Sequence, residues 1–416
     1  MPSSDRRVRL ASAAVLVPSV IALLAACSAG APGASTASST GGSTVAPVSK
    51  GVSRVAIELV SSGSGDECQI SHTTAKAGPV TFTITNTSAT GITEAELMQG
   101  QRILGEKENL APGLAAVTFT TTLTGGDYAV VCPGATTESI PFTVTGKAAA
   151  ASGSDASTLL AAGTKTYGDY VASTLGDMVT AVENLQTAVD SGDVAAAKQR
   201  YAVARPFYEK VESDVEGFVL PGTDPTDNTG NLDYLIDMRA SNLDTAVGWS
   251  GFHAIERDLW QGGRITAETK QYAADLTTNV GKLVSLATTL TYKPEDLANG
   301  AAGLLEEVQS GKITGEEERY SHLDLVDFAA NVEGAQQAFA NLEPGLKAID
   351  PTLTQQVTDR FAAVTEALTK YEDASLAGGY ERYTPALRAK DAASLSSTVQ
   401  SLQEPLSRIA EKVAAA

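Results

Sequence analysis

A histidine and a glutamate lie one helical turn apart in a chain that contains only three histidines. These residues, His253 and Glu256, are at positions i and i+3 of the segment Gly-Phe-His-Ala-Ile-Glu, so a helix would place both side chains on one face. An imidazole and a carboxylate in this arrangement can bind one cation together, or they can hydrogen-bond to each other inside a core. The spacing alone leaves both interpretations open.

Carboxylates in two other predicted helices favour the cation. Glu209 and Glu212 have the same i, i+3 spacing. Asp324, Asp327 and Asn331 follow the spacing i, i+3, i+7, and carboxylates buried on one helix face would repel one another without a cation. Oxygen ligands with one or two imidazoles suit iron, manganese or zinc better than copper(I).

The composition narrows the possible function classes. The chain has 416 residues, of which 43% are apolar and 19% charged, as is typical of a globular protein of two or three domains. Asp and Glu number 49 against 30 Lys and Arg, which gives a formal net charge of −19. So acidic a protein is repelled by nucleic acids and anionic membrane surfaces. We therefore expect no nucleic-acid partner and a role in handling cations.

The N-terminus is typical of a bacterial lipoprotein signal. Arg6 and Arg7 supply positive charge, and Leu10–Leu24 is an apolar stretch too short to span a bilayer. Small residues then lead directly to Cys27. We expect residues 1–26 to be removed and a lipid on Cys27 to anchor the exported chain to the outer face of the cell membrane. Residues 27–52, rich in Ser, Gly, Ala and Thr, are predicted to form a flexible tether.

Residues 53–146 are predicted to form a small β-sandwich, because short β-branched runs alternate with turn residues. The predicted strands are Arg54–Val60, Val80–Thr85, Ala116–Leu123, Tyr128–Cys132 and Ile140–Val144. Cys68 and Cys132 remain as an isolated cysteine pair once Cys27 carries a lipid. In an oxidising compartment the pair could form a disulfide or act as two soft metal ligands, and both alternatives stay open.

The remainder of the chain is predicted to be all-helical. After an Ala/Gly/Ser linker at 147–156, apolar residues recur every three or four positions through 157–416, which indicates an antiparallel bundle of long helices. One stripe runs from Leu175 to Val189, and Ser191-Gly192-Asp193 is expected to end that helix and cap the next. Pro221–Asn231 is a crossover or a rim loop. The fold class is thus multi-domain, a β-sandwich followed by a helical bundle.

Four blocks of the helical region match a known family in order and in content. They are Gly251–Trp260, Leu305–Val308, Ile313–Leu325 and Asn331–Gly334. These blocks resemble the EfeO family, the extracytoplasmic components of the EfeUOB iron-uptake system, whose helical domain is imelysin-like. The resemblance implies iron bound in the helical domain and delivered to an iron permease, with a haem peroxidase as a further partner.

Site residues can be carried over from this family by position. The resemblance implies iron ligation by His253 and Glu256, by the aspartate of the next helix, Asp275, and by a later glutamate, Glu333. It also implies a cupredoxin-like fold for residues 53–146. In that domain Cys68, Glu96 and Cys132 would bind a second metal, copper or iron.

The sequence after Cys132 departs from one cupredoxin pattern. Pro133–Thr136 contains neither the histidine nor the methionine that a blue-copper centre places beside its cysteine. An electron-transfer copper site is therefore not expected in the N-terminal domain.

The imelysin name also raises a second function, that of a metal-dependent peptidase. Peptide hydrolysis needs a metal-bound water and a general base, usually arranged as His-Glu-x-x-His. Here Arg257 follows His253 by one turn, so a second imidazole would have to come from His322. The acidic run Glu316–Glu318 just before it is expected to be solvated in part. We therefore expect an iron-binding protein that is not an enzyme, with the peptidase as the alternative.

Overall fold

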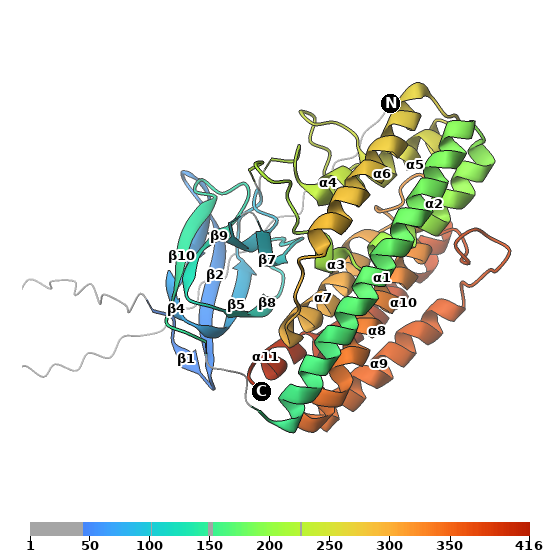
Figure 1. Ribbon diagram of the computed structural model, residues 1–416. Coiled ribbons are helices and arrows are strands. Elements are labelled where there is room, and N and C mark those ends of the chain that lie inside the picture. Colours follow the sequence, from blue (N-terminus) through green and yellow to red (C-terminus); the bar gives the residue numbers. More distant parts are fainter. Residues whose placement is uncertain (1–44, 101, 149–152, 225–226) are drawn as a thin grey trace, which may run out of the picture. The chain divides into compact units, whose positions relative to one another are not determined.

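The computed structural model describes residues 45–100, 102–148, 153–224 and 227–416, which form a β-sandwich domain and a helical domain (Figure 1). The predicted signal at 1–26, the lipidated Cys27 and most of the predicted tether lie outside the described residues. The end of that tether is structured rather than flexible, because Val45 bridges to Thr74 and the short strand β1 (Val48–Ser49) pairs with β2 (Val52–Ser62). No helix within the described ranges is both long and apolar enough to cross a membrane.

Two five-stranded sheets make up the β-sandwich. The first has the order β1-β2-β5-β8, with β3 paired to β2, and the second has the order β4-β10-β9-β6-β7. The strands are β1 Val48–Ser49, β2 Val52–Ser62, β3 Gly65–Ile70, β4 Thr74–Lys76, β5 Gly78–Asn86, β6 Ala95–Gln99, β7 Arg102–Lys107, β8 Val117–Leu123, β9 Gly126–Val131 and β10 Ser139–Thr145. All five predicted strands are confirmed, as β2, β5, β8, β9 and β10. The other strands escaped prediction because they are short or rich in polar residues.

The alternation predicted for β5 builds the core of the sandwich. Val80, Phe82 and Ile84 are buried, since every second side chain of a strand points to the same face. The ring of Phe82 stacks on Phe119 of β8, with 5.0 Å between their centroids, and meets the edge of Phe142 of β10 at 5.5 Å. These three aromatic rings join the two sheets.

The helical domain begins at α1 and contains several long helices that run side by side (Figure 1). Its helices are α1 Asp155–Ser191, α2 Val194–Glu209, α3 Glu212–Val215, α4 Leu232–Asp237, α5 Gly251–Glu256, α6 Ala267–Ala287, α7 Pro294–Glu307, α8 Asp324–Ile349, α9 Pro351–Thr369, α10 Pro385–Leu406 and α11 Ile409–Ala414. Two π-helical turns extend α5 and α7, η1 Arg257–Gln261 and η2 Val308–Lys312. Helix α1 packs against α2, α6 and α8.

The predicted helix break after α1 is confirmed. Helix α1 ends at Ser191, and Gly192 takes a left-handed conformation with φ 80° that a side chain would disfavour. Asp193 then accepts hydrogen bonds from the backbone N–H groups of Ala195 and Ala196 and so caps α2. This turn sends α2 back along α1, which brings the polar end of α2 into the bundle.

Short helices and loops complete the domain between the long helices. The two ends of the predicted interruption Pro221–Asn231 lie together, because Val219 pairs with Asn231. This pairing fits a rim loop, one of the two predicted alternatives, and residues 225–226 lie outside the described residues. The chain then forms the short helices α4 and α5. A second irregular stretch, 313–323, connects η2 to α8. These short segments and the C-terminal end of α2 supply most of the charged groups described below.

Candidate metal centre

His253 and Glu256 share one face of α5, as their spacing predicts, and both are buried. Nδ1 of His253 lies 3.1 Å from Oε2 of Glu256. The other carboxylate oxygen of Glu256 accepts hydrogen bonds from the backbone N–H groups of Tyr320 and Ser321, each at 2.7 Å. Because Glu256 is held on both oxygens, it fixes the orientation of the imidazole and leaves Nε2 facing the interior.

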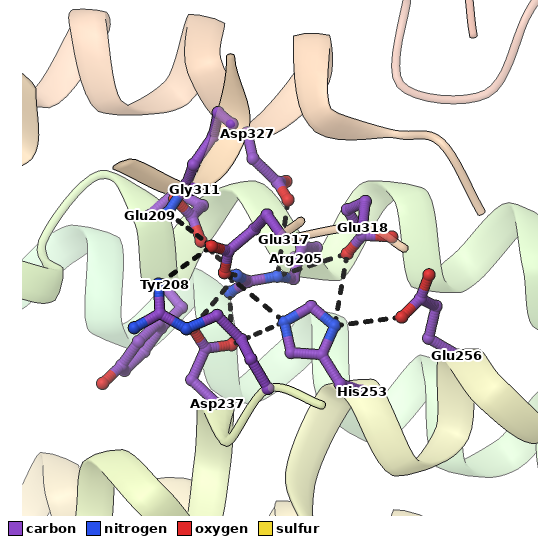
Figure 2. A network of polar contacts seen from close by, with 12 residues as sticks. Arg205, Tyr208, Glu209, Asp237, His253, Glu256, Gly311, Glu317, Glu318 and Asp327 are labelled. Atoms are coloured by element: carbon purple, nitrogen blue, oxygen red, sulfur yellow. Dashed lines mark hydrogen bonds and ion pairs between the residues drawn. The ribbon is translucent and has the colours of Figure 1, made fainter. Parts of the chain in front are cut away.

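Two carboxylates lie opposite this nitrogen. Nε2 of His253 is 3.6 Å from Oδ1 of Asp237, at the end of α4, and 3.5 Å from Oε1 of Glu317, in the stretch between η2 and α8 (Figure 2). The potential ligand atoms of these three buried residues all lie within 4.8 Å of one another. Nε2 itself forms no hydrogen bond within the described residues. One imidazole and two carboxylates are donors that suit iron, manganese or zinc.

A fully buried arginine lies beside these three residues (Figure 2). Arg205 of α2 approaches Asp237 through Nη1 at 2.7 Å and Nη2 at 3.0 Å, and it approaches Glu317 through Nη2 at 2.9 Å. Its guanidinium also pairs with three further carboxylates, those of Glu209, Glu318 and Asp327. Arg205 therefore joins the acidic groups of four separate segments.

Two more cations contact the far side of Glu317. Lys312 of η2 lies 3.3 Å from Oε2 of Glu317 and 3.1 Å from Oε2 of Glu209. Arg239 lies 3.1 Å from the same oxygen of Glu317 and 2.9 Å from Glu307. Carboxylates still outnumber these permanent cations, since the buried acidic residues here are Glu209, Glu212, Asp237, Glu256, Glu307, Glu317, Glu318, Asp324 and Asp327. The charges of the cluster are therefore not balanced by these cations, and a further positive charge would be attracted to it.

Proton uptake offsets part of the excess negative charge. Burial raises the pKa of Asp237 to about 7 and that of Glu318 to about 7, and it raises the pKa of Asp327 well above its ordinary value. Burial lowers the pKa of His253, but the neighbouring carboxylates of Glu256 and Glu317 outweigh this and raise it well above its ordinary value. An incoming multivalent cation can displace such protons.

Glu317 behaves differently from the other acids of the cluster. Although burial acts to raise its pKa, Lys312 and Arg239 outweigh that effect and hold the pKa of Glu317 well below its ordinary value. This carboxylate is therefore ionised at neutral pH. It presents one oxygen to His253 and Arg205 and the other to Lys312 and Arg239.

The structure does not bring Asp275 or Glu333 to His253. Asp275 lies exposed on α6 and accepts a hydrogen bond from Gln271 at 2.9 Å. The side chain of Glu333 is 52% exposed on α8 and pairs with Lys210 at 2.9 Å. Both residues face away from the apolar stripes that turn their helices inward, so the geometry does not place these two residues, assigned by position, in the candidate centre.

The carboxylates predicted to share a face of α8 do turn inward. Asp324, Asp327 and Asn331 are all buried, as are Glu209 and Glu212 near the end of α2. Asn331 donates from Nδ2 to the backbone oxygen of Glu209 at 2.9 Å, which ties α8 to α2. The spacing argument thus found acidic residues of the network that are not themselves among the three potential ligands.

The expectation that the run Glu316–Glu318 is solvated in part is confirmed. Glu316 is partly exposed, whereas Glu317 and Glu318 are buried. His322 follows in the same stretch but does not belong to the ligand group of the described residues. Asp237 was missed altogether, although Asp233 and Asp237 at i, i+4 were a visible sign of an acidic helix face.

In the β-sandwich, Cys68 of β3 and Cys132, directly after β9, form a disulfide. This is one of the two alternatives that the sequence left open, and it removes both sulfurs as metal ligands. Glu96 is paired with Val131 across β6 and β9, and Val131 points away from the core in which Cys132 lies. The implied ligand set Cys68, Glu96 and Cys132 is therefore not assembled, and no group of three potential ligands occurs in the described part of the sandwich.

Glu96 instead lies opposite Glu106 of β7. Burial and the charges of Glu106 and Glu94 raise the pKa of Glu96 to about 9 from its ordinary 4.5. The folded protein therefore holds a proton that the unfolded chain releases, and stability falls as the pH rises between these values.

Glu96→Gln removes this pH-dependent cost. We expect the variant to melt a few degrees higher than the parent protein at pH 8 and at nearly the same temperature at pH 4.5. Calorimetry at both pH values tests this, with the exposed Glu58→Gln on β2 as the control. An equal shift at both pH values would contradict the prediction.

The Imelysin family model matches residues 163–409, which include every residue of the metal centre described above. The chain therefore belongs to the imelysin family. Two curated relatives are named "Iron uptake system component EfeO", from Escherichia coli (strain K12) and Shigella flexneri. Each is 34% identical over 347 residues, which cover 82% of this chain and 88% of the relative. The protein is thus an EfeO homologue.

A solved structure resembles the N-terminal part of the chain. Rusticyanin from Thiobacillus ferrooxidans is similar over 25% of this chain and 83% of its own, with 18% sequence identity and a TM-score of 0.21.

Proposed function

We propose that this protein captures iron outside the cytoplasm and delivers it to a membrane permease, with Asp237, His253 and Glu317 as the iron ligands. The observation that carries the proposal is the convergence of these three buried donors within 4.8 Å. The surplus of buried carboxylates around them favours a multivalent cation. The name of the relatives, iron uptake system component, supports iron as the cargo.

Other residues have supporting roles in this proposal. Glu256 orients the imidazole of His253 through the contact at Nδ1 and so presents Nε2 to the metal. A lipid on Cys27 would keep the protein at the outer face of the membrane, near the permease and near a haem peroxidase of the same system. The metal here is cargo, so the site has to release it as well as bind it.

A binding role agrees better with the donor set than peptidase activity does. Within the described residues, the ligand group contains a single histidine. The carboxylate placed best to serve as a general base, Glu256, is occupied by two backbone N–H groups and by His253. A base in that position must be able to accept a proton from water. We therefore propose that the protein is not an enzyme.

Titration with ferrous iron under anaerobic conditions and with ferric citrate tests the ligands. We expect His253→Ala and Asp237→Asn each to weaken iron binding at least tenfold, because each removes a direct donor. His322→Ala and Asp275→Asn are matched controls outside the centre, and both should bind iron like the parent protein.

Two results would overturn the proposal. One is unchanged iron affinity in both ligand variants, with circular dichroism showing that they are folded. The other is metal-dependent cleavage of a peptide library that is lost in His253→Ala, which would favour the peptidase instead.

A further inference from the structure

We propose that Arg205 is a built-in counter-cation of the metal centre. It holds Asp237 and Glu317 together when no metal is bound, and it lowers the affinity for metal so that the cargo can leave. This inference rests on the proposed function, since it assigns to Arg205 a role in metal release from the same site.

The first argument is that Arg205 and the metal would use the same oxygen atoms. Oδ1 of Asp237 lies 2.7 Å from Nη1 of Arg205, and Oε1 of Glu317 lies 2.9 Å from Nη2. These are also the two oxygens nearest Nε2 of His253, at 3.6 Å and 3.5 Å. A cation bound among the three donors would therefore share its ligands with the guanidinium.

The second argument is that the positive charge of Arg205 cannot be removed by titration. A guanidinium stays protonated at any pH at which the protein is folded. The side chain is fully buried, so water does not screen its repulsion of a metal ion. This repulsion weakens metal binding across the whole physiological pH range.

The third argument is that Arg205 keeps other partners when a metal takes Asp237 and Glu317. Its guanidinium also pairs with Glu209, with Glu318 at 3.5 Å and with Asp327 at 3.6 Å. The guanidinium carbon lies 5.5 Å from the centroid of the Phe252 ring. Arg205 can thus shift towards these groups without becoming an unpaired buried charge, and it can return when the metal leaves.

Arg205→Gln separates this role from a purely structural one. We expect the variant to bind iron at least tenfold more tightly and to release it more slowly to a chelator, while its melting temperature without metal falls. A merely structural arginine would lower affinity and stability together. Arg205→Lys keeps a charge and should bind iron with nearly the parent affinity, and Arg408→Gln, on an exposed pair with Glu404, is the control.

Chemical rescue adds a second measurement. Guanidinium added at millimolar concentration to Arg205→Ala should raise its melting temperature and weaken its iron binding, and it should do neither in the parent protein. If Arg205→Gln does not fold, the double variant Arg205→Gln with Asp327→Asn replaces the guanidinium together with one of its carboxyl partners, and tighter iron binding is expected there too.

The outcomes distinguish the two proposals. If the parent protein binds iron but folded Arg205→Gln or the double variant binds it no more tightly, the inference about Arg205 is wrong and the proposed function stands. If the parent protein does not bind iron, the proposed function itself is wrong.

Discussion

Replacing Glu317 with glutamine is expected to lower the free energy of unfolding by about 3–5 kcal/mol in the absence of metal, the cost of breaking a buried ion pair from one side. Within the described ranges, Glu317 is the one carboxylate that contacts Arg205, Lys312 and Arg239 together. Its low pKa means that it is fully charged at neutral pH. Glutamine has nearly the same shape, so the loss reports on the charge and not on packing.

Glu318→Gln is the matched control, since Glu318 is the next residue and equally buried. Burial raises the pKa of Glu318 to about 7, so this carboxyl is about half neutral at pH 7 already. The amide oxygen of a glutamine can accept a hydrogen bond from one of the two hydroxyl groups that contact Glu318, those of Tyr201 and Ser321, and its amide nitrogen can donate to the other. We expect this substitution to cost about 1 kcal/mol or less at pH 7.

Glu317 and Glu318 affect the pH dependence of stability in opposite directions. The stabilisation by Glu317 is fully present above its unfolded pKa near 4.5 and is lost only as the pH falls towards its depressed folded value. The deficit of Glu317→Gln should thus be the same at pH 6 and pH 8. Because the folded pKa of Glu318 is raised, the parent protein loses stability relative to Glu318→Gln as the pH rises from about 5 to 8.

Urea unfolding in the presence of a chelator measures these differences without a contribution from bound metal. Equal losses of stability in Glu317→Gln and Glu318→Gln at pH 7 would show that the two carboxylates have the same charge state, against the prediction.

The sequence was sufficient to predict which residues of a single helix or strand share one face. The i, i+3 spacing placed His253 and Glu256 on one face, and the i, i+3, i+7 spacing placed Asp324, Asp327 and Asn331 together, because both depend only on the helical period. The period of two in β5 likewise predicted which residues fill the sandwich core. No such period exists in the irregular stretches that carry Glu317 and lead to Asp237.

Which carboxylates lie near His253 therefore depends on how separate segments pack together, and the sequence pattern does not show this. Asp237 and Glu317 meet His253 only because α4, α5 and the stretch before α8 converge on α2. Glu317 and Glu318 resemble solvated surface in the sequence, but Arg205, Lys312 and Arg239 from other segments make their burial favourable.

A signal for this burial was present on α2. Arg205 lies on the same apolar stripe as Tyr201 and Tyr208, four and three residues away, and both tyrosines are fully buried. An arginine on a buried face needs acidic partners. By contrast, the positions of Asp275 and Glu333 carry no such signal, because neither residue lies on the inward face of its helix.

Gly251→Ala is expected to lower the free energy of unfolding by about 3–4 kcal/mol and to weaken metal binding as well. Gly251 begins α5 with φ 66°, a left-handed conformation that a side chain disfavours. An added Cβ would lie 2.0 Å from the backbone oxygen of Ile236, so α4 and α5 would have to separate. Helices α4 and α5 carry Asp237 and His253, and Oδ1 of Asp237 lies 3.6 Å from Nε2 of His253. Separating the two helices would therefore change the distance between these two potential ligand atoms.

Gly281→Ala is the control for the loss of a glycine. This residue is exposed in the interior of α6, and an added Cβ would meet no atom within 4 Å. Alanine there should stabilise the protein by about 0.5–1 kcal/mol, since it restricts the unfolded chain and favours the helix. Urea unfolding and iron titration of both variants give the comparison. If Gly251→Ala keeps the parent affinity for iron, then the contact between α4 and α5 does not set the spacing of the ligands, and the centre does not depend on Asp237 and His253 as a pair.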